Sequence, residues 1–552
     1  MQQASGTKSL VAATVVVAAL SLAATACGSA SKTQAQNTTG TTVPVKANIV
    51  VPTRGAPKAG GSIVYAVEGE SDGWNPTTSR WSAPALTEAN TVFDPLAAWG
   101  PNYDVQPYLA DSFTHNADYT VWNIKVRPGI TFHDGEKLDA AAVKQDLDAV
   151  KKSVLTGTAL GPVVSVSVVD DLTVAVHMNM PWSVFPATLT AQVGLMAAPR
   201  QLTANDTLHP VGTGPYVFSS WVQNSTFVVK KNLHYWRHGL PYLDQVTFKP
   251  IPEAHTMNDA LSAGDIDMME TSSNQIQLKM VSAAKSGQIQ LVYSRGETEE
   301  ASVMLNTTEA PMNDLSVRQA IAYATDHLSW AKAVDADPAN IADGPFAPGS
   351  KWYISTGFPT FDLAKAKALV SQYVTRHGSP PTFTLQCTPD SLVLQTCQIL
   401  QNQWERAGMQ VKITTTEQAT LISNALQGAY QATIWRQFGG QDPDFDSVWW
   451  NGANTKPPLA LNMARNVDPK IDAALYVGRT SDKKYERQLA YITVARQLAK
   501  DLPYIWMSHT VWTIGARNDV RGFENTTLPN GEMTNPVTSG VERLGQIWLA
   551  TS

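Results

Sequence analysis

The chain has 552 residues, enough for two or three lobes that each bury a hydrophobic core. Charged residues make up 16% of the sequence and the formal net charge is −6, so the composition offers no basic face for nucleic acid or anionic lipid. Its sixteen tryptophans suit either aromatic-walled pockets or core packing, and composition does not separate the two roles.

The N-terminus has the pattern of an export signal. Lys8 precedes an apolar run over residues 10–22, which is too short to span a bilayer comfortably. The small residues 23–26 then lead to Cys27, which resembles a lipoprotein processing site of the actinobacterial style, although Ala24 stands where such sites usually carry Leu. We therefore predict a lipoprotein signal peptide over residues 1–27 and lipidation of Cys27. Simple cleavage after an Ala-x-Ala-like site is the alternative.

Residues 28–60 form a predicted tether. The stretch is rich in Ser, Thr, Gln, Asn, Gly, Ala and Pro, has no aromatic residue, and cannot bury enough apolar surface to offset its ordering entropy. Residues 61–67 then predict a buried strand, and a loop over residues 71–76 carries Trp74 before a helical region that ends near Phe93.

Residues 102–205 have the pattern of an inserted lobe. Residues 120–126 alternate as a strand, and residues 163–178 predict a hairpin that turns at Asp170. Asp139 is placed to cap a helix through Leu147.

The histidines give no convincing metal site. His133 has no second ligand at a usable spacing, and we interpret it as structural. His234 and His238 lie four residues apart, but Gly239 and Pro241 indicate a loop there and no third ligand follows. We predict no metal and no cofactor.

Residues 211–267 give the clearest series of elements. Two glycines and a proline at 212–215 predict a tight turn. Predicted strands follow at 216–221, 226–230 and 246–251, and then a short helix at 254–262. Gly264 supplies a left-handed cap for this helix. None of these residues has a catalytic pattern, so we interpret the segment as scaffold.

Several motifs in this segment and beyond it resemble those of family 5 extracellular solute-binding proteins, the peptide- and nickel-type receptors of ABC importers. In order along the chain they are Phe-His-Asp-Gly at 132–135, Gly-Thr-Gly-Pro-Tyr at 212–216, Asn232 with Tyr235 and Trp236, Pro241, Gly-Asp-Ile-Asp at 264–267, Asn306, Val-Arg-Gln-Ala-Ile at 317–321 with Asp326, and Asp-Pro-Asp at 442–444. The resemblance covers the chain from about Gly60 to the C-terminus.

The resemblance implies an α/β, two-lobed, periplasmic-binding-protein-like (type II) fold with an extra inserted lobe. It implies that lobe I is built from residues 61–101, 206–296 and 517–552, that lobe II is the insertion at 102–205, and that lobe III spans 297–516. In such proteins the loop after the first strand borders the ligand cleft, which makes Trp74 a candidate wall; packing within the lobe is the alternative.

The resemblance also implies that the chain crosses from lobe I to lobe III near residues 288–297. Gly296 suits a hinge because glycine tolerates large backbone changes. Arg295 and Glu297 would then flank the mouth of the cleft, unless they are merely a solvated pair.

Lobe III has clear helix and strand patterns and carries two cysteines. We predict helices at 316–324, 361–370 and 392–407 and a strand at 383–387. Cys387 and Cys397 lie ten residues apart, and outside the cytoplasm such a pair is most simply a disulfide. Neither cysteine has a neighbouring histidine, which argues against a catalytic thiol.

Residues 435–449 are the main candidate contact with a solute. In peptide-binding relatives an aspartate four residues before the proline pairs with the peptide α-amine, and here that position is Gly439. An unpaired buried ammonium is costly, so either Asp442 or Asp444 replaces this aspartate or the ligand lacks a free amine. Both aspartates could instead cap the following helix. A flat or bulky ligand would stack on aromatic side chains here. The candidate contacts are Trp435, Arg436, Phe438, Gly439, Asp442, Asp444 and Trp449.

A binding receptor is the function that these features favour. The expected partners are a peptide or peptide-like solute, the permease subunits of an ABC importer and, through the lipid anchor, the outer face of the cytoplasmic membrane; we expect a monomer. The sequence contains no Gly-x-Ser-x-Gly, Gly-x4-Gly-Lys, Cys-x-x-Cys or His-Glu-x-x-His pattern, so we predict no enzymatic activity. A secreted enzyme, or a sensor or chaperone-like lipoprotein, remains the alternative because fold does not fix function.

Overall fold

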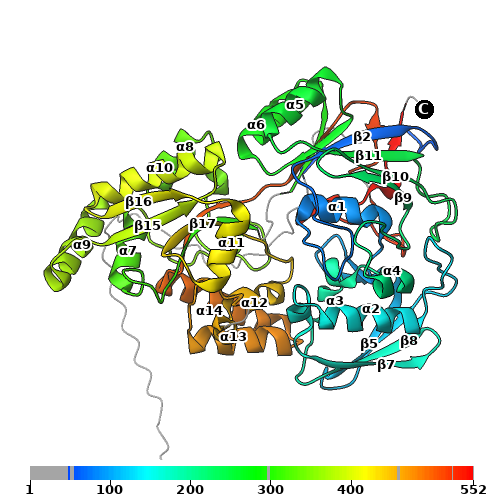
Figure 1. Cartoon of the computed structure of the whole chain (residues 1–552), viewed down its shortest axis with the longest axis horizontal. Coiled ribbons are helices and arrows are strands. Elements are labelled where there is room, and N and C mark those ends of the chain that lie inside the picture. The colour runs from blue at the N-terminus through cyan, green and yellow to red at the C-terminus, as the bar shows by residue number, and fades with distance from the viewer. Residues whose placement is uncertain (1–47, 50–54, 295–298, 457–459, 525, 551–552) are drawn as a thin grey trace, which may run out of the picture. The chain divides into compact units, whose positions relative to one another are not determined.

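The first strand predicted from the sequence, β2 (Ser62–Val67), pairs in parallel with β11 (Gln245–Pro250) and β12 (Met268–Thr271) in the sheet of lobe I. Figure 1 labels β2 and β11 side by side. The computed structural model describes residues 48–49, 55–294, 299–456, 460–524 and 526–550. Within these ranges the sheet has the order β1 (Asn48–Ile49), β13 (Gln290–Tyr293), β19 (Thr513–Ala516), β12 (Met268–Thr271), β2, β11 (Gln245–Pro250), β10 (Thr226–Lys231) and β9 (Tyr216–Val222). The strands predicted at 216–221, 226–230 and 246–251 are therefore confirmed.

Three helices accompany this sheet. They are α1 (Ala83–Val92), α5 (Ala254–Ala263) and α6 (Asn274–Lys285). Helix α5 ends at Gly264, whose φ of 83° is left-handed as predicted. On one side of the sheet Met257 of α5 and Met280 of α6 are fully buried, whereas residues of α1 pack with Phe227 and Phe248 in a separate core cluster.

Lobe II is built on an antiparallel sheet. Its strands within the described residues have the order β5 (Ala110–His115), β6 (Val121–Val126), β8 (Thr173–Met178) and β7 (Val163–Asp170). The predicted hairpin is the pair β7–β8. Helix α2 (Ala140–Lys152) begins after Asp139, whose carboxylate accepts a hydrogen bond from the Ala142 amide, so the predicted cap is confirmed. The short helices α3 (Phe185–Thr188) and α4 (Pro199–Ala204) complete this region.

Lobe III is built on a mixed sheet. Its described strands have the order β16 (Gln410–Thr415), β15 (Thr382–Cys387), β17 (Ala432–Gln437), β14 (Glu300–Leu305) and β18 (Tyr504–His509). Its helices are α7 (Leu315–Ala324), α8 (His327–Ala333), α9 (Leu363–His377), α10 (Ser391–Arg406), α11 (Gln418–Gln427), α12 (Ser447–Trp450), α13 (Pro469–Thr480) and α14 (Lys484–Asp501). The predicted helices at 316–324, 361–370 and 392–407 correspond to α7, α9 and α10. A disulfide joins Cys387 at the end of β15 to Cys397 in α10.

The C-terminal residues return to lobe I. Strand β19 pairs with β12 and β13, so the return begins at Thr513, four residues before the predicted boundary. Beyond it, Phe523, Leu544 and Ile547 pack into the core of lobe I. Small two-stranded sheets complete the described chain: β3 (Ala97–Trp99) with β4 (Val105–Pro107), β20 (Val520–Arg521) with β23 (Trp548–Leu549), and β21 (Val537–Thr538) with β22 (Val541–Glu542). None of the helices in the described ranges combines the length and apolar character that crossing a membrane requires.

Candidate binding site

The signature residues of the 211–236 segment form a hydrogen-bonded network around Asp94. The Asp94 carboxylate accepts from the Tyr235 hydroxyl at 3.1 Å and from the Trp236 indole N–H at 2.9 Å. Burial raises the pKa of Asp94 to about 6, and these two hydrogen bonds oppose the rise. The side-chain amide of Asn232 donates to the carbonyl of Gly214 at 3.0 Å. These hydrogen bonds tie the segment together, which agrees with its interpretation as scaffold.

The glycines of this segment serve close packing between backbones. A Cβ on Gly214 would lie 2.5 Å from the carbonyl carbon of Val92, and one on Gly212 would lie 2.2 Å from the Val92 carbonyl oxygen. His133 packs beside them, with Nε2 3.0 Å from the Gly214 carbonyl oxygen. Burial lowers the pKa of His133 to about 4, so the ring is neutral at physiological pH, which agrees with its interpretation as structural. Among the described residues no group of three or more His, Cys, Asp and Glu side chains could hold a metal ion.

A cavity of about 600 Å³ lies among residues of all three lobes. This volume is in the range of about 300–1,000 Å³ that small-molecule sites occupy. Seven aromatic residues are among those that line it, which agrees with one of the two roles considered for the tryptophans. The aromatic lining residues are Trp81, Trp99, Trp182, Trp435, Phe438, Phe445 and Trp449.

The predicted contact segment supplies one wall of this cavity. Strand β17 ends at Gln437, and a 3-10 turn at Pro443–Asp446 leads into α12. Trp435, Phe438, Gly439, Asp444 and Trp449 all line the cavity, so five of the seven candidates in this segment lie together. The Phe438 side chain is half exposed. We call these five residues the lobe III wall.

Asp444 already has two partners within the protein. Its carboxylate accepts from the Arg479 guanidinium at 2.8 Å and from the Trp182 indole N–H at 2.7 Å. The Arg479 guanidinium also lies 4.9 Å from the centre of the Trp182 ring. Burial raises the pKa of Asp444, and Arg479 and Trp182 oppose this. Lobe II and lobe III therefore meet at this carboxylate.

Asp442 does not line the cavity, which corrects its assignment as a ligand contact. Its carboxylate caps the 3-10 turn by accepting from the Asp444 amide, the alternative role considered from the sequence. It also forms an ion pair of 2.5 Å with Arg487, and both side chains are more than 90% buried. Both of these contacts use Oδ1 of Asp442, so this oxygen is already engaged within the protein.

Arg436 also faces a protein partner instead of the cavity. Its guanidinium pairs with Glu299 and donates to the Ser272 hydroxyl at 2.9 Å, linking β17 to lobe I. Glu299 itself lines the cavity and accepts from the Trp512 indole N–H at 2.7 Å. The candidate contact at Arg436 is thus replaced by Glu299, a residue that no sequence pattern identified.

Trp74 is not a wall of the cavity, which corrects that prediction. Its ring is fully buried in the core of lobe I, 4.2 Å from the ring centre of Phe227 and 5.7 Å from that of Trp221. The alternative of packing within the lobe is the one observed, because β9 and β10 bring two aromatic rings against the loop. The candidate residues Arg295 and Glu297 and the predicted lipidation site at Cys27 lie outside the described residues.

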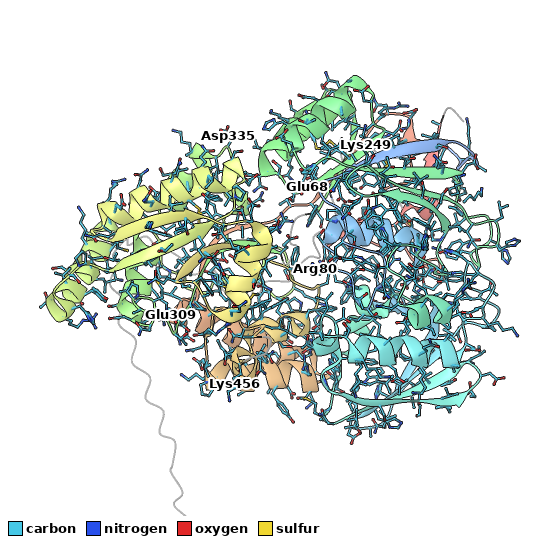
Figure 2. The ribbon with its side chains drawn as sticks, in the orientation of Figure 1. Glu68, Arg80, Lys249, Glu309, Asp335 and Lys456 are labelled. Atoms are coloured by element: carbon cyan, nitrogen blue, oxygen red, sulfur yellow. A yellow bond between two sulfur atoms is a disulfide. The ribbon has the colours of Figure 1, made fainter. Side chains whose placement is uncertain are left out.

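The part of the lining that comes from the C-terminal segment was not predicted from the sequence. Thr526, Asn535 and Arg543 line the cavity, and so does Arg80 on the loop before α1 (labelled in Figure 2). Threonine, asparagine and arginine in a loop-rich segment have no periodic pattern. Only the return of the C-terminal segment to lobe I brings Thr526, Asn535 and Arg543 to the cavity.

These features define a class of protein. A cavity of this size, lined by aromatic, aliphatic and polar side chains, is suited to hold a small solute. The match to known sequences identifies the family: residues 104–457 match the bacterial extracellular solute-binding proteins, family 5 (middle region), and the chain belongs to this family. The resemblance stated from the motifs is confirmed.

The relatives agree with this assignment. The chain is 28% identical over 444 residues to the glutathione-binding protein GsiB of Pectobacterium atrosepticum, covering 76% of this chain and 84% of the relative. The oligopeptide-binding protein AppA of Bacillus subtilis, solved with a nonapeptide, superposes with a TM-score of 0.76 at 20% identity over 90% of this chain and 100% of AppA. NikZ of Campylobacter jejuni, solved with Ni(L-His), gives 0.73 at 22% identity over 87% and 97%. These two structures confirm the predicted fold class.

Proposed function

We propose that this protein is an extracytoplasmic receptor that captures a peptide or peptide-like solute and delivers it to the permease of an ABC importer. The observation that carries the proposal is the aromatic cavity of about 600 Å³ in a chain of family 5. A relative named for glutathione and a structural neighbour that holds a nonapeptide both point to peptides as the solute class.

Capture by closure of the lobes fits the contacts beside the cavity. The Ser183 amide and hydroxyl in lobe II donate to the carbonyl oxygens of Arg479 and Ser481 in lobe III at 3.0 and 2.7 Å. These hydrogen bonds, like that between Trp182 and Asp444, join lobes that would separate on opening. If closure accompanies binding, small-angle scattering will show a smaller radius of gyration when the solute is added.

The proposed location follows from the N-terminal sequence. Lipidation at Cys27 would hold the receptor at the outer face of the cytoplasmic membrane, with residues 28–60 as a tether. We expect the native protein to partition into detergent and a Cys27→Ser variant to be released. A wild-type protein that is already free of the membrane fraction would contradict the anchor.

Isothermal titration tests the receptor function directly. Glutathione and a panel of short aromatic peptides should include at least one solute that binds in a 1:1 ratio, and mass spectrometry should recover that solute unchanged. Cleaved or modified peptide would indicate an enzyme instead. Failure of every peptide to bind would contradict the peptide assignment.

A further inference from the structure

The C-terminal segment brings hydrogen-bond donors without protein acceptors to the cavity. Thr526 is 2% exposed, and its hydroxyl has no hydrogen-bond partner within the described part of the chain. The side-chain nitrogen of Asn535 is likewise buried and unpartnered there. The two residues are close neighbours, because the Thr534 amide donates to the carbonyl of Thr526. Buried polar groups are normally paired, so these two call for an explanation.

Arg543 adds a charge beside them. Its guanidinium lies 4.7 Å from the centre of the Tyr108 ring and makes no hydrogen bond or ion pair with any residue in the described ranges. Arg543 and Thr526 also line a second, smaller pocket next to Asp94 and Arg237, which places them together. We call Thr526, Asn535 and Arg543 the donor cluster.

The nearby acids form no ion pair or hydrogen bond with Arg543 within the described residues. Asp94 interacts electrostatically with Arg543 and, less strongly, with Arg237, while its carboxylate accepts hydrogen bonds from Tyr235 and Trp236. Glu542, the last residue of β22, precedes Arg543, and its carboxyl accepts a hydrogen bond from the Tyr65 hydroxyl at 2.9 Å. Burial raises the pKa of Glu542 to about 8, so at neutral pH this carboxyl is mostly uncharged.

The other charged side chains that line the cavity form ion pairs within the protein. The acidic lining residues are Glu299, which pairs with Arg436, and Asp444, which pairs with Arg479. Arg80 pairs with Asp72 at 2.8 Å. Of the charged side chains described in the lining, Arg543 alone has no ion pair, so the cavity has one excess positive charge and no acid that is free to bind an amine.

We propose that the donor cluster binds a carboxylate of the solute and that the solute needs no free amine. An arginine with two neutral donors beside it matches the several acceptor sites of a carboxylate. The aromatic lobe III wall takes the apolar body of the solute through Phe438 and Trp449. This inference rests on the proposed receptor function and names its solute class as aromatic peptide-like acids.

A matched set of tripeptides tests the inference. Ala-Phe-Phe is prepared in four forms, with the N-terminus free or acetylated and the C-terminus acid or amide, and each is titrated into the full-length protein. Amidation should weaken binding by about 10–100-fold, the usual effect of removing a charge-assisted hydrogen bond, and acetylation should change it by less than about threefold.

Variants assign the effect to the cluster. Arg543→Gln should remove the difference between acid and amide, and Arg543→Lys should restore part of it. Thr526→Val, which keeps the side-chain shape, provides a second variant if Arg543→Gln fails to fold, and should reduce the difference. The exposed Arg496 of α14 lies outside the cavity lining, so Arg496→Gln should leave the difference unchanged.

The possible outcomes distinguish failure of the carboxylate site from failure of the proposed receptor function. Equal binding of acid and amide, with no effect of Arg543→Gln, would overturn the carboxylate site and leave the peptide receptor intact. Binding that is lost on acetylation would overturn the amine-free solute class in the same way. Binding of none of the four forms would overturn the peptide receptor and, with it, the inference.

Discussion

Two sides of the cavity satisfy their polar groups differently. On the lobe III wall Asp444 is held by Arg479 and Trp182, and behind that wall Asp442 is held by Arg487. In the donor cluster of the C-terminal segment no acceptor within the described residues meets Thr526 or Arg543. A charge that the protein already neutralises serves the fold, whereas a donor that the protein leaves unpaired is available to a ligand.

The largest expected effect concerns the lobe III side of the cavity, where the buried charges are paired within the protein. Asp442→Ala leaves Arg487, which is 8% exposed, without its carboxylate, and should lower the free energy of unfolding by about 3–5 kcal/mol. Urea unfolding measures this. As a control, Asp148→Ala breaks a partly exposed i,i+4 pair with Lys144 and should cost about 0.5 kcal/mol or less. Unchanged stability together with lost peptide binding would make Asp442 a ligand residue after all.

The second prediction concerns the carboxyl beside the donor cluster. Because burial raises the pKa of Glu542 to about 8, the folded state keeps a proton that the unfolded state releases above about pH 4.5. Wild-type stability should therefore fall, relative to Glu542→Gln, by about 1.4 kcal/mol per pH unit between pH 5 and 8.

Urea unfolding of both proteins at several pH values measures this difference, and the other buried acids cancel in the comparison. Parallel profiles would mean that Glu542 is ionised in the fold and supplies a negative charge next to Arg543. Arg543 would then have a charged neighbour, and the donor cluster would no longer differ from the lobe III wall in leaving a charge unpaired.

The third prediction concerns the aromatic part of the lobe III wall. Phe438 is 50% exposed, so Phe438→Ala should barely change stability but should weaken binding of an aromatic peptide by about tenfold. Phe361, which is 42% exposed and absent from the cavity lining, is the matched control. Equal binding by the Phe438→Ala and Phe361→Ala variants would show that the solute does not stack on this wall.

The smallest effect is expected at Arg80, a lining residue whose charge is already paired. Arg80 and Asp72 form an exposed ion pair, with 72% and 41% of the side chains accessible, so Arg80→Gln should cost about 1 kcal/mol of stability at most. Binding of the acetylated tripeptide acid should weaken about twofold or less, since this arginine already has a carboxylate. A loss as large as that of Arg543→Gln would show that unpaired charge is not what selects the solute.

Local patterns predicted most of the secondary structure. The β7–β8 hairpin, the Asp139 cap of α2 and the Gly264 end of α5 each depend on residues within a few positions of one another. Such features are encoded by spacing and side-chain chemistry, so the sequence alone was sufficient for them.

The site depended on contacts that spacing does not encode. Trp74 packs on Phe227 from β10, Trp182 binds Asp444 from another lobe, and Arg543 lies over Tyr108 of lobe II. The family motif in the sequence pointed to the residues of the lobe III wall. It did not show which of the charged side chains in and behind that wall are already paired within the protein. For the same reason the two glycines of the 212–216 motif were predicted to form a turn, whereas their close packing against Val92 appeared only in three dimensions.

A crystal structure of the protein with the solute that co-purifies from its native source would show directly whether the donor cluster binds a carboxylate. We expect a solute carboxylate within hydrogen-bonding distance of the Arg543 guanidinium, with Asp444 still bound to Arg479 and Trp182. A solute ammonium bound to Asp444, with Arg543 facing solvent, would contradict it.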